Sequence, residues 1–199
     1  KFKTKAGRDS PYFFNTGKFS NGKLLTTLAD FYAKKILDII NAHGLKVDCL
    51  FGPAYKGIPL VSAIAVTLCD YSLNLDIAYD RKEKKIHGEG GQIVGDINGK
   101  NVLIIDDVIS AGLSSRRAIE IVRKEKGVIS GILVALDRME QGQSVASRDY
   151  KNTTEEITES MGVPVFSIVK LSDLKNHSEI DGKNLKQIDS YLKKFGSLN

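Results

Sequence analysis

The chain has 199 residues, of which 42% are hydrophobic and 27% charged, and its formal net charge is +5 at pH 7. This composition excludes a disordered tail or a low-complexity array and is enough for one domain with its own core. No apolar stretch approaches the roughly 18 residues that a membrane-spanning helix needs. The positive charge fits either a lysine-rich surface or a site for an anion, whether a nucleic acid or a small polyphosphate.

Basic residues occur as pairs along the chain and not as a stripe interleaved with aromatic residues. This distribution favours a compact anion site over extended contact with nucleic acid. Two cysteines, Cys49 and Cys69, both lie in apolar runs. We therefore expect buried free thiols and a cytoplasmic protein without a membrane partner.

Predicted helices and buried strands alternate along the chain. The pattern predicts, in chain order, a helix over residues 22–43, a strand over 47–52, a helix over 58–69, a strand over 75–79, a charged and glycine-rich stretch over 81–91, a strand over 101–108, a helix over 114–125, a strand over 130–137, a helix over 153–161, a strand over 163–169 and a helix over 182–195. Such alternation indicates a parallel sheet covered by helices on both faces. Ligands of such sheets bind at the carboxyl ends of the strands.

The most informative segment runs from Asp106 to Ser114, DDVISAGLS. Two carboxylates that end a buried strand are costly to desolvate unless they are paired. The turn that follows has small residues, and the next helix adds its positive end, so the segment suits a sugar phosphate. An acidic helix start without a ligand is the alternative. Neither the phosphate loop of nucleotide triphosphatases nor the dinucleotide-binding glycine motif is present.

Five segments together carry a resemblance. They are KAGRDSPYFFN at Lys5–Asn15, FGPAYKGIP at Phe51–Pro59, RKEKKIHGEGG at Arg81–Gly91, the Asp106–Ser114 segment and ALDR at Ala135–Arg138. In order and approximate spacing the chain resembles the orotate phosphoribosyltransferases, which are type I phosphoribosyltransferases. The resemblance implies one domain over 1–199, with a mostly parallel central sheet flanked by helices. It also implies a small hood, formed by residues 1–20 and part of the C-terminal region, and a mobile catalytic loop over 81–92.

The resemblance implies a pentosyltransferase of pyrimidine (UMP) biosynthesis. Such an enzyme transfers the 5-phosphoribosyl group from 5-phosphoribosyl 1-diphosphate to orotate, giving orotidine 5-monophosphate and pyrophosphate. Mg²⁺ is the implied cofactor, held mainly by the substrate, so no metal ligand is assigned to the protein. A homodimer that shares the catalytic loop between subunits is also implied, with no nucleic-acid partner.

The resemblance also assigns residues to roles, position by position. Catalysis falls to Lys82, Lys85, His87 and Asp107. The residues matched to the phosphoribosyl diphosphate are Lys5, Tyr55, Lys56, Arg81, Lys82, Lys85, His87, Asp106, Asp107, Val108, Ile109, Ser110, Ala111, Gly112, Leu113 and Ser114. Those matched to orotate are Lys5, Phe13, Phe14, Ser110 and Arg138. The two phenylalanine rings are expected in the core, with their backbone meeting the pyrimidine.

Taken alone, PAYKG would be an ordinary turn and the 81–91 stretch a solvated surface loop. Three positions depart from the family pattern: Ile86 replaces a common acidic residue, Ser110 replaces threonine but keeps the hydroxyl, and Leu113 replaces a small hydroxyl residue that touches the phosphate. The alternatives are a phosphoribosyltransferase for a purine, a non-catalytic regulator that keeps the donor site and, third, a nucleic-acid-binding module suggested by the positive charge alone. The orotate-end segments weigh against the first, and the retained basic loop weighs against the second.

Overall fold

The computed structural model describes residues 2–82, 92–142, 152–175 and 182–196. A six-stranded sheet forms its centre, in the order β5-β4-β3-β6-β7-β8. The strands are β3 (Cys49–Gly52), β4 (Asp76–Asp80), β5 (Ile93–Val94), β6 (Asn101–Ile109), β7 (Val128–Asp137) and β8 (Val165–Lys170). Neighbours pair in parallel except β4 and β5, which are antiparallel. The predicted mostly parallel sheet is confirmed, with β5 as an additional antiparallel edge strand.

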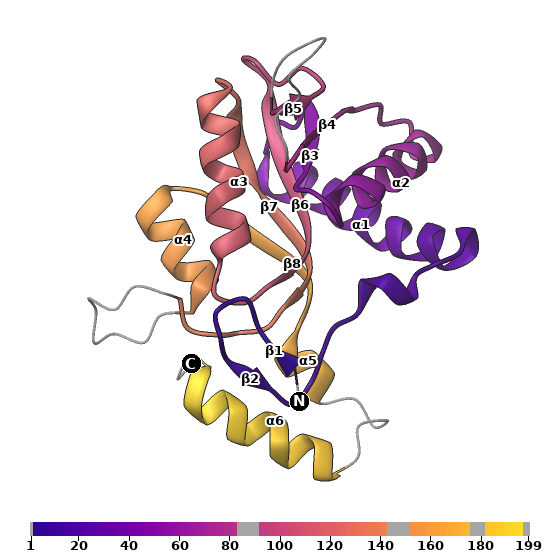
Figure 1. Cartoon of the computed structure of the whole chain (residues 1–199). Helices are drawn as coiled ribbons and strands as arrows, with labels where there is room; N and C mark the ends of the chain where they lie inside the picture. The colour runs from indigo at the N-terminus through magenta and orange to yellow at the C-terminus, as the bar shows by residue number, and fades with distance from the viewer. Residues whose placement is uncertain (1, 83–91, 143–151, 176–181, 197–199) are drawn as a thin grey trace.

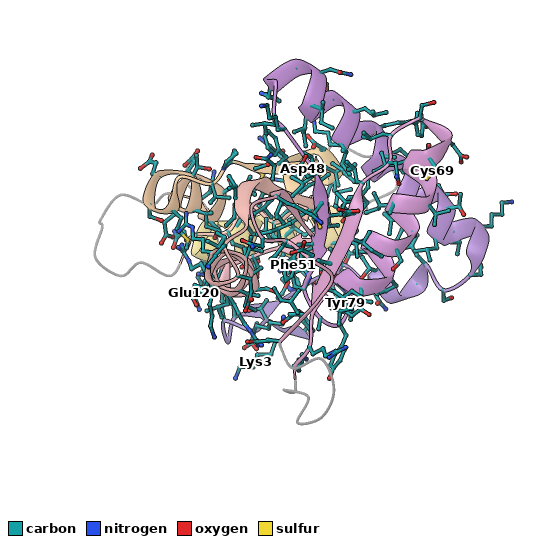
Figure 2. The ribbon with its side chains drawn as sticks, turned by 90° about the horizontal axis from the view of Figure 1, so that it is seen from above. Lys3, Asp48, Phe51, Cys69, Tyr79 and Glu120 are labelled. Atoms are coloured by element: carbon teal, nitrogen blue, oxygen red, sulfur yellow. The ribbon has the colours of Figure 1, made fainter. Side chains whose placement is uncertain are left out.

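Helices cover both faces of this sheet, as Figure 1 shows. On one face, α1 (Gly22–His43) and α2 (Gly57–Asp70) pack over the leucines and isoleucines that alternate strand positions direct toward them, such as Leu50 and Ile105. On the other face, α3 (Leu113–Lys124) and α4 (Thr153–Met161) pack over the intervening positions, such as Phe51. Phe51 lies near the centre of the molecule in Figure 2, between the two helix layers.

The N-terminal segment forms a small two-stranded unit outside the main sheet. Its strands β1 (Phe2–Lys3) and β2 (Asp9–Ser10) pair antiparallel, and the short helix η1 (Thr16–Lys18) leads from them to α1. This hairpin lies beside the C-terminal helix α6 (Gly182–Phe195), near α5 (Leu171–Lys175) (Figure 1). Tyr12 meets Tyr191 of α6 edge-on, with ring centres 6.0 Å apart. The N-terminal segment and the C-terminal helix thus lie together beyond the carboxyl ends of the sheet strands.

One expectation about the cysteines is wrong. Cys49 is a buried free thiol on β3, but Cys69 is exposed on α2, where Figure 2 shows it away from the centre of the molecule. The apolar pattern around Cys69 belongs to a helix that buries only one of its faces. None of the helices in the described part of the chain combines the length and apolar character needed to span a bilayer.

Two glycines hold the turn after β3 close to the start of α2. A Cβ built on Gly52 would lie 2.4 Å from the backbone oxygen of Gly57, and one built on Gly57 would lie 2.6 Å from the backbone carbon of Gly52. These neighbouring atoms belong to the backbone, which cannot move aside as the end of a flexible side chain can. Glycine at both positions therefore lets the chain fold back on itself and present Tyr55 and Lys56 at the strand end.

We expect Gly52→Ala to lower the free energy of unfolding by about 1–3 kcal/mol, the usual range for overpacking. Thermal unfolding monitored by circular dichroism measures this. Gly22→Ala is the matched control, because a Cβ at the first residue of α1 would meet nothing within 4 Å. Equal melting temperatures for the two variants would contradict the close-approach argument.

Candidate active site

A cavity of about 350 Å³ opens where the carboxyl ends of β3, β4, β6 and β7 meet the N-terminal segment. Its lining residues are Phe2, Thr4, Lys5, Ala6, Phe13, Phe14, Pro53, Ala54, Tyr55, Lys56, Lys82, Asp106, Asp107, Val108, Ile109, Ser110, Ala111, Gly112, Leu113, Ser114, Ser115 and Arg138. The parallel arrangement accounts for this convergence, since loops that follow parallel strands emerge at the same edge of the sheet.

Most residues assigned by the resemblance line this one cavity. Arg81 does not; it follows β4 and its backbone N–H donates to the Gln92 oxygen at 2.7 Å. Lys85 and His87 lie outside the described residues, as does Ile86. The structure therefore brings residues that the resemblance assigns together from five separate stretches of chain. Of the predicted catalytic loop, it describes residues 81, 82 and 92.

Asp107 is paired with side chains from two other parts of the chain. Its Oδ2 accepts hydrogen bonds from Lys56 Nζ and from Thr16 Oγ1, each at 2.7 Å. Asp107 is only 4% exposed, whereas half of the Lys56 side chain is open to solvent. The lysine ammonium also lies 5.7 Å from the centre of the Phe13 ring. These contacts join the turn after β3, the N-terminal segment and the end of β6 at one point.

Asp106 is also buried, and its environment opposes ionisation. Burial raises the pKa of its carboxyl to about 6, and the charge of Asp107 adds to this effect. A hydrogen bond from the Asp107 backbone N–H to Asp106 Oδ1, at 2.9 Å, acts in the opposite direction. The buried Tyr32 of α1 donates to the Asp106 backbone oxygen at 2.8 Å and thereby fixes the strand end against the helix layer.

The turn between β6 and α3 depends on Gly112. This residue has φ +78°, and a Cβ at its position would lie 2.7 Å from Thr153 Cγ2 of α4. Glycine is therefore required both by the left-handed backbone and by the packing of α4. Leu113, the first residue of α3, is 41% exposed and lines the cavity without filling it.

The turn after β3 carries a cis peptide bond between Ala54 and Tyr55. The Ala54 backbone N–H donates to Asp80 Oδ1 at 2.5 Å, and Asp80 is the last residue of β4. Lys82, two residues further on, places its ammonium 4.3 Å from the centre of the Tyr55 ring. The beginning of the 81–92 stretch is thus connected to the turn that holds Tyr55 and Lys56.

Arg138 follows β7 and forms the far end of the cavity. It is 3% exposed, yet it lines the cavity and stacks 4.1 Å from the centre of the Tyr12 ring. Burial alone lowers the pKa of the guanidinium, but the charge and hydrogen bond of Glu140, together with Tyr12 and Tyr191, outweigh this and hold the pKa above its usual value. Arg138 is therefore a permanently charged planar donor facing the cavity.

The expectation that both phenylalanine rings belong to the core is wrong for Phe13. That ring is 49% exposed and lies against Phe2, with ring centres 4.5 Å apart, at the edge of the cavity. Phe14 is partly buried and packs against the core on the α1 side of the sheet. Both residues lie between β2 and η1, where the Phe13 ring meets Phe2 of the hairpin and the Phe14 ring meets the core.

Sequence reasoning missed three polar residues that support the site. They are Thr16, which donates to Asp107; Asp80, which accepts from Ala54; and Glu140, which accepts from Arg138. Asp80 and Glu140 each lie at or just after the end of a predicted strand, the position that marked Asp106 and Asp107, so the same rule applied to every strand would have found them. Thr16 has no such signal, because its partner is 91 residues away.

Asp106 and Asp107 are the two carboxylates that the described residues contribute to the cavity lining, and two ligands are too few to hold a metal ion by protein side chains alone. Among the residues that the structure describes, no three His, Cys, Asp or Glu side chains gather as a metal-binding group. Mg²⁺ commonly uses one or two carboxylates together with phosphate oxygens of a substrate. The Asp106–Asp107 pair fits that limited role and not a complete protein cage.

Comparison with known proteins gives the class to which this fold and cavity belong. The family model of the phosphoribosyl transferase domain matches residues 21–167. Orotate phosphoribosyltransferase of Thiobacillus denitrificans is 43% identical over 198 residues, covering 98% of this chain and 89% of the relative. That of Nitrosomonas europaea is 49% identical over 173 residues, covering 87% of this chain and 72% of the relative.

Solved structures agree with these relatives. The crystal structure of orotate phosphoribosyltransferase from Francisella tularensis is 36% identical, with a TM-score of 0.77, and the match covers 98% of this chain and 92% of that one. The chain therefore belongs to the phosphoribosyltransferase family and, within it, to the orotate phosphoribosyltransferases.

The raised pKa of Asp106 predicts how stability depends on pH. In the unfolded chain this carboxyl titrates near its ordinary value of about 3.9. Between that value and about 6, the folded state keeps a proton that the unfolded state has lost, so the free energy of unfolding falls as pH rises. Above this window both states are ionised, and the folded state carries the full cost of the buried charge.

We therefore expect Asp106→Asn to raise the melting temperature at pH 8, by the equivalent of about 1–3 kcal/mol, and to do so less at pH 5. The same substitution at exposed Asp70, the last residue of α2, is the control and should have little effect at either pH. A stabilisation of Asp106→Asn that is equal at both pH values would contradict the assignment.

Proposed function

We propose that this chain uses the cavity to transfer the 5-phosphoribosyl group from 5-phosphoribosyl 1-diphosphate to orotate. The observation that carries the proposal is the convergence of the matched donor and orotate residues on one cavity. An acidic pair lies at its centre, a lysine lies beside that pair, and a guanidinium lies at its far end. The acidic pair suits ribose hydroxyls, the lysine suits a diphosphate, and the guanidinium suits the carboxylate of a pyrimidine.

In the proposed reaction, the bond between the anomeric carbon of ribose and the diphosphate oxygen breaks, and a ring nitrogen of orotate forms the new bond to that carbon. That nitrogen gives up its proton, which the released diphosphate takes. Asp106 and Asp107 accept hydrogen bonds from the ribose hydroxyls. The turn from Ser110 to Ser114 surrounds the 5-phosphate at the start of α3, where backbone N–H groups favour an anion. Val108, Ile109, Ala111, Gly112 and Leu113 form the wall of this part of the cavity.

Lys56 and Tyr55 face the diphosphate, and binding of the donor draws the Lys56 ammonium away from Asp107. Arg138 meets the carboxylate or carbonyl edge of orotate, with Ser110 and Lys5 nearby and the backbone of Phe13 and Phe14 beside the ring. The task of these groups is to hold two anions in reacting geometry and to stabilise the charge that grows on the leaving diphosphate.

Mg²⁺ is part of the proposal. The Asp106–Asp107 pair is the only carboxylate group that the described residues place in the cavity lining, so the ion would be held mainly by substrate oxygens. When bound, Mg²⁺ neutralises charge on the diphosphate. Lys56 and Lys82 act on the same charge from the protein side.

The homodimer also stays a proposal. In it, residues 81–92 close over the bound substrates and exclude water, and Lys82, Lys85 and His87 act in the site of the partner subunit. The hairpin and α6 form the hood over the orotate end. Within this single chain, Lys82 lines the cavity of its own subunit, so a cis role for this lysine is the alternative to be tested.

The direct experiment mixes the protein with orotate, the diphosphate donor and Mg²⁺ and follows the loss of orotate absorbance. Adenine and hypoxanthine serve as controls for a purine enzyme, the second candidate. Turnover of orotate with neither purine consumed supports the proposal. Turnover of a purine alone, or binding of the donor without turnover of any base, contradicts it.

We expect that mixing inactive Lys82→Ala and inactive Asp107→Ala chains restores activity through hybrid dimers. In a hybrid, one site has an intact Asp107 from its own chain and an intact Lys82 from its partner. Up to about a quarter of wild-type activity is the statistical expectation, because half the dimers are hybrids and each has one complete site. Activity that remains absent after reassociation would place Lys82 in its own subunit's site.

A second prediction concerns Leu113, where relatives have a small hydroxyl residue. We expect Leu113→Thr to lower the KM for the diphosphate donor about two- to fivefold, because a neutral hydrogen bond contributes about 1 kcal/mol. Leu113→Val is the matched control, since it has the shape of threonine without the hydroxyl. An equal decrease for both variants would assign the effect to shape, and an increase for threonine would show that the leucine is required.

A further inference from the structure

Glu140 is a buried carboxylate that collects three donors at the orotate end of the cavity. It lies three residues beyond β7 and is 1% exposed. Its Oε1 accepts hydrogen bonds from Arg138 Nε at 2.6 Å and from the Tyr191 hydroxyl at 2.9 Å. Its Oε2 accepts from Arg8 Nη1 at 2.9 Å. Each carboxylate oxygen thus faces a different neighbour, one toward the cavity arginine and one toward the N-terminal hairpin.

The backbone around Glu140 is held firmly. Its carbonyl oxygen accepts from both the backbone N–H and the hydroxyl of Thr153, at 2.9 and 3.0 Å. Met139 has φ +54°, and its backbone N–H donates to Asp137 Oδ1 at 2.8 Å. This left-handed residue turns the chain so that the side chains of Arg138 and Glu140, two positions apart, meet.

These contacts fix the plane of the Arg138 guanidinium. Glu140 holds Nε, Ser10 Oγ accepts from Nη2 at 2.9 Å, and the Tyr12 ring lies 4.1 Å from the central carbon. An arginine offers its donors as a planar fork, so restraint at Nε and one terminal nitrogen sets the direction of the remaining donors. Arg138 still reaches the cavity lining.

We propose that Glu140 is a positioning residue that sets the plane of the Arg138 guanidinium for the edge of orotate. It contributes to orotate affinity through Arg138 and makes no contact with the cavity itself. This inference rests on the proposed function, in which Arg138 meets orotate. The second contact of Glu140, with Arg8, attaches the N-terminal hairpin to the segment after β7. Because this contact does not involve Arg138, its removal is a control for the effect on orotate.

We expect Glu140→Gln to raise the KM for orotate at least about tenfold while the KM for the diphosphate donor changes less than about twofold. Loss of a charge-assisted hydrogen bond has an effect of this size. Arg8→Gln is the matched control, because it removes the other ion pair of the same carboxylate. It should lower the melting temperature but leave the KM for orotate within about twofold of the wild type. An equal rise in KM for both variants would make Glu140 merely structural and would overturn the proposal.

A double-mutant cycle separates this inference from the function on which it rests. If Glu140 acts through Arg138, adding Glu140→Gln to Arg138→Ala produces no further rise in the KM for orotate. Additive effects would overturn the positioning role. An Arg138→Ala variant whose KM for orotate is unchanged would instead remove Arg138 from the proposed site, and this inference with it.

Should Glu140→Gln fail to fold, Glu140→Asp provides the same test. Aspartate keeps the charge but withdraws the carboxylate by one methylene, so Arg138 Nε loses its partner at the required distance. We expect the same selective rise in the KM for orotate. A folded Glu140→Asp enzyme with wild-type KM values for both substrates would overturn the proposal.

Discussion

The charge of two adjacent carboxylates at the end of β6 is the constraint on which the site depends. Asp106 and Asp107 are 8% and 4% exposed, so their ionised forms need partners that only the fold can bring. Lys56 comes from the turn after β3 and Thr16 from the N-terminal segment. Because β3 and β6 are parallel neighbours, that turn emerges beside the carboxylates. The topology of the sheet therefore places Lys56 where its positive charge stabilises the two buried carboxylates.

At the opposite end of the cavity a buried positive charge is stabilised by a negative one. There the buried group is the Arg138 guanidinium, and Glu140 is its partner. The N-terminal segment takes part at both ends, through Thr16 of η1 near Asp107 and through Ser10 and Arg8 of the hairpin near Arg138 and Glu140. An acidic centre and a basic end are thereby held at a fixed separation by one short segment of chain. A ligand with sugar hydroxyls and a separate anionic ring matches that division.

Much of this architecture was predictable from the sequence, because helices and buried strands of an alternating fold have strong apolar patterns. The bounds of α1, α4 and α6 agree with prediction, and those of α2 and α3 differ by one residue at each end. The two-residue strands β1, β2 and β5 were missed, since so short a segment has no period. The Asp106–Ser114 segment was found because its residues are contiguous. Arg8 and Thr16 were not, because their carboxylate partners are 132 and 91 residues away.

The antiparallel pair β4–β5 has a consequence for how this enzyme family can change. Tyr79 and Asp80 pair with Val94 and Ile93, and the Arg81 N–H donates to the Gln92 oxygen at 2.7 Å. Backbone pairing therefore holds the residues before the 83–91 stretch against the residues after it. Insertions or replacements within it would not shift the register of the sheet. Under the proposed function, the sequence of this stretch can therefore change without a cost to the folding stability of the sheet.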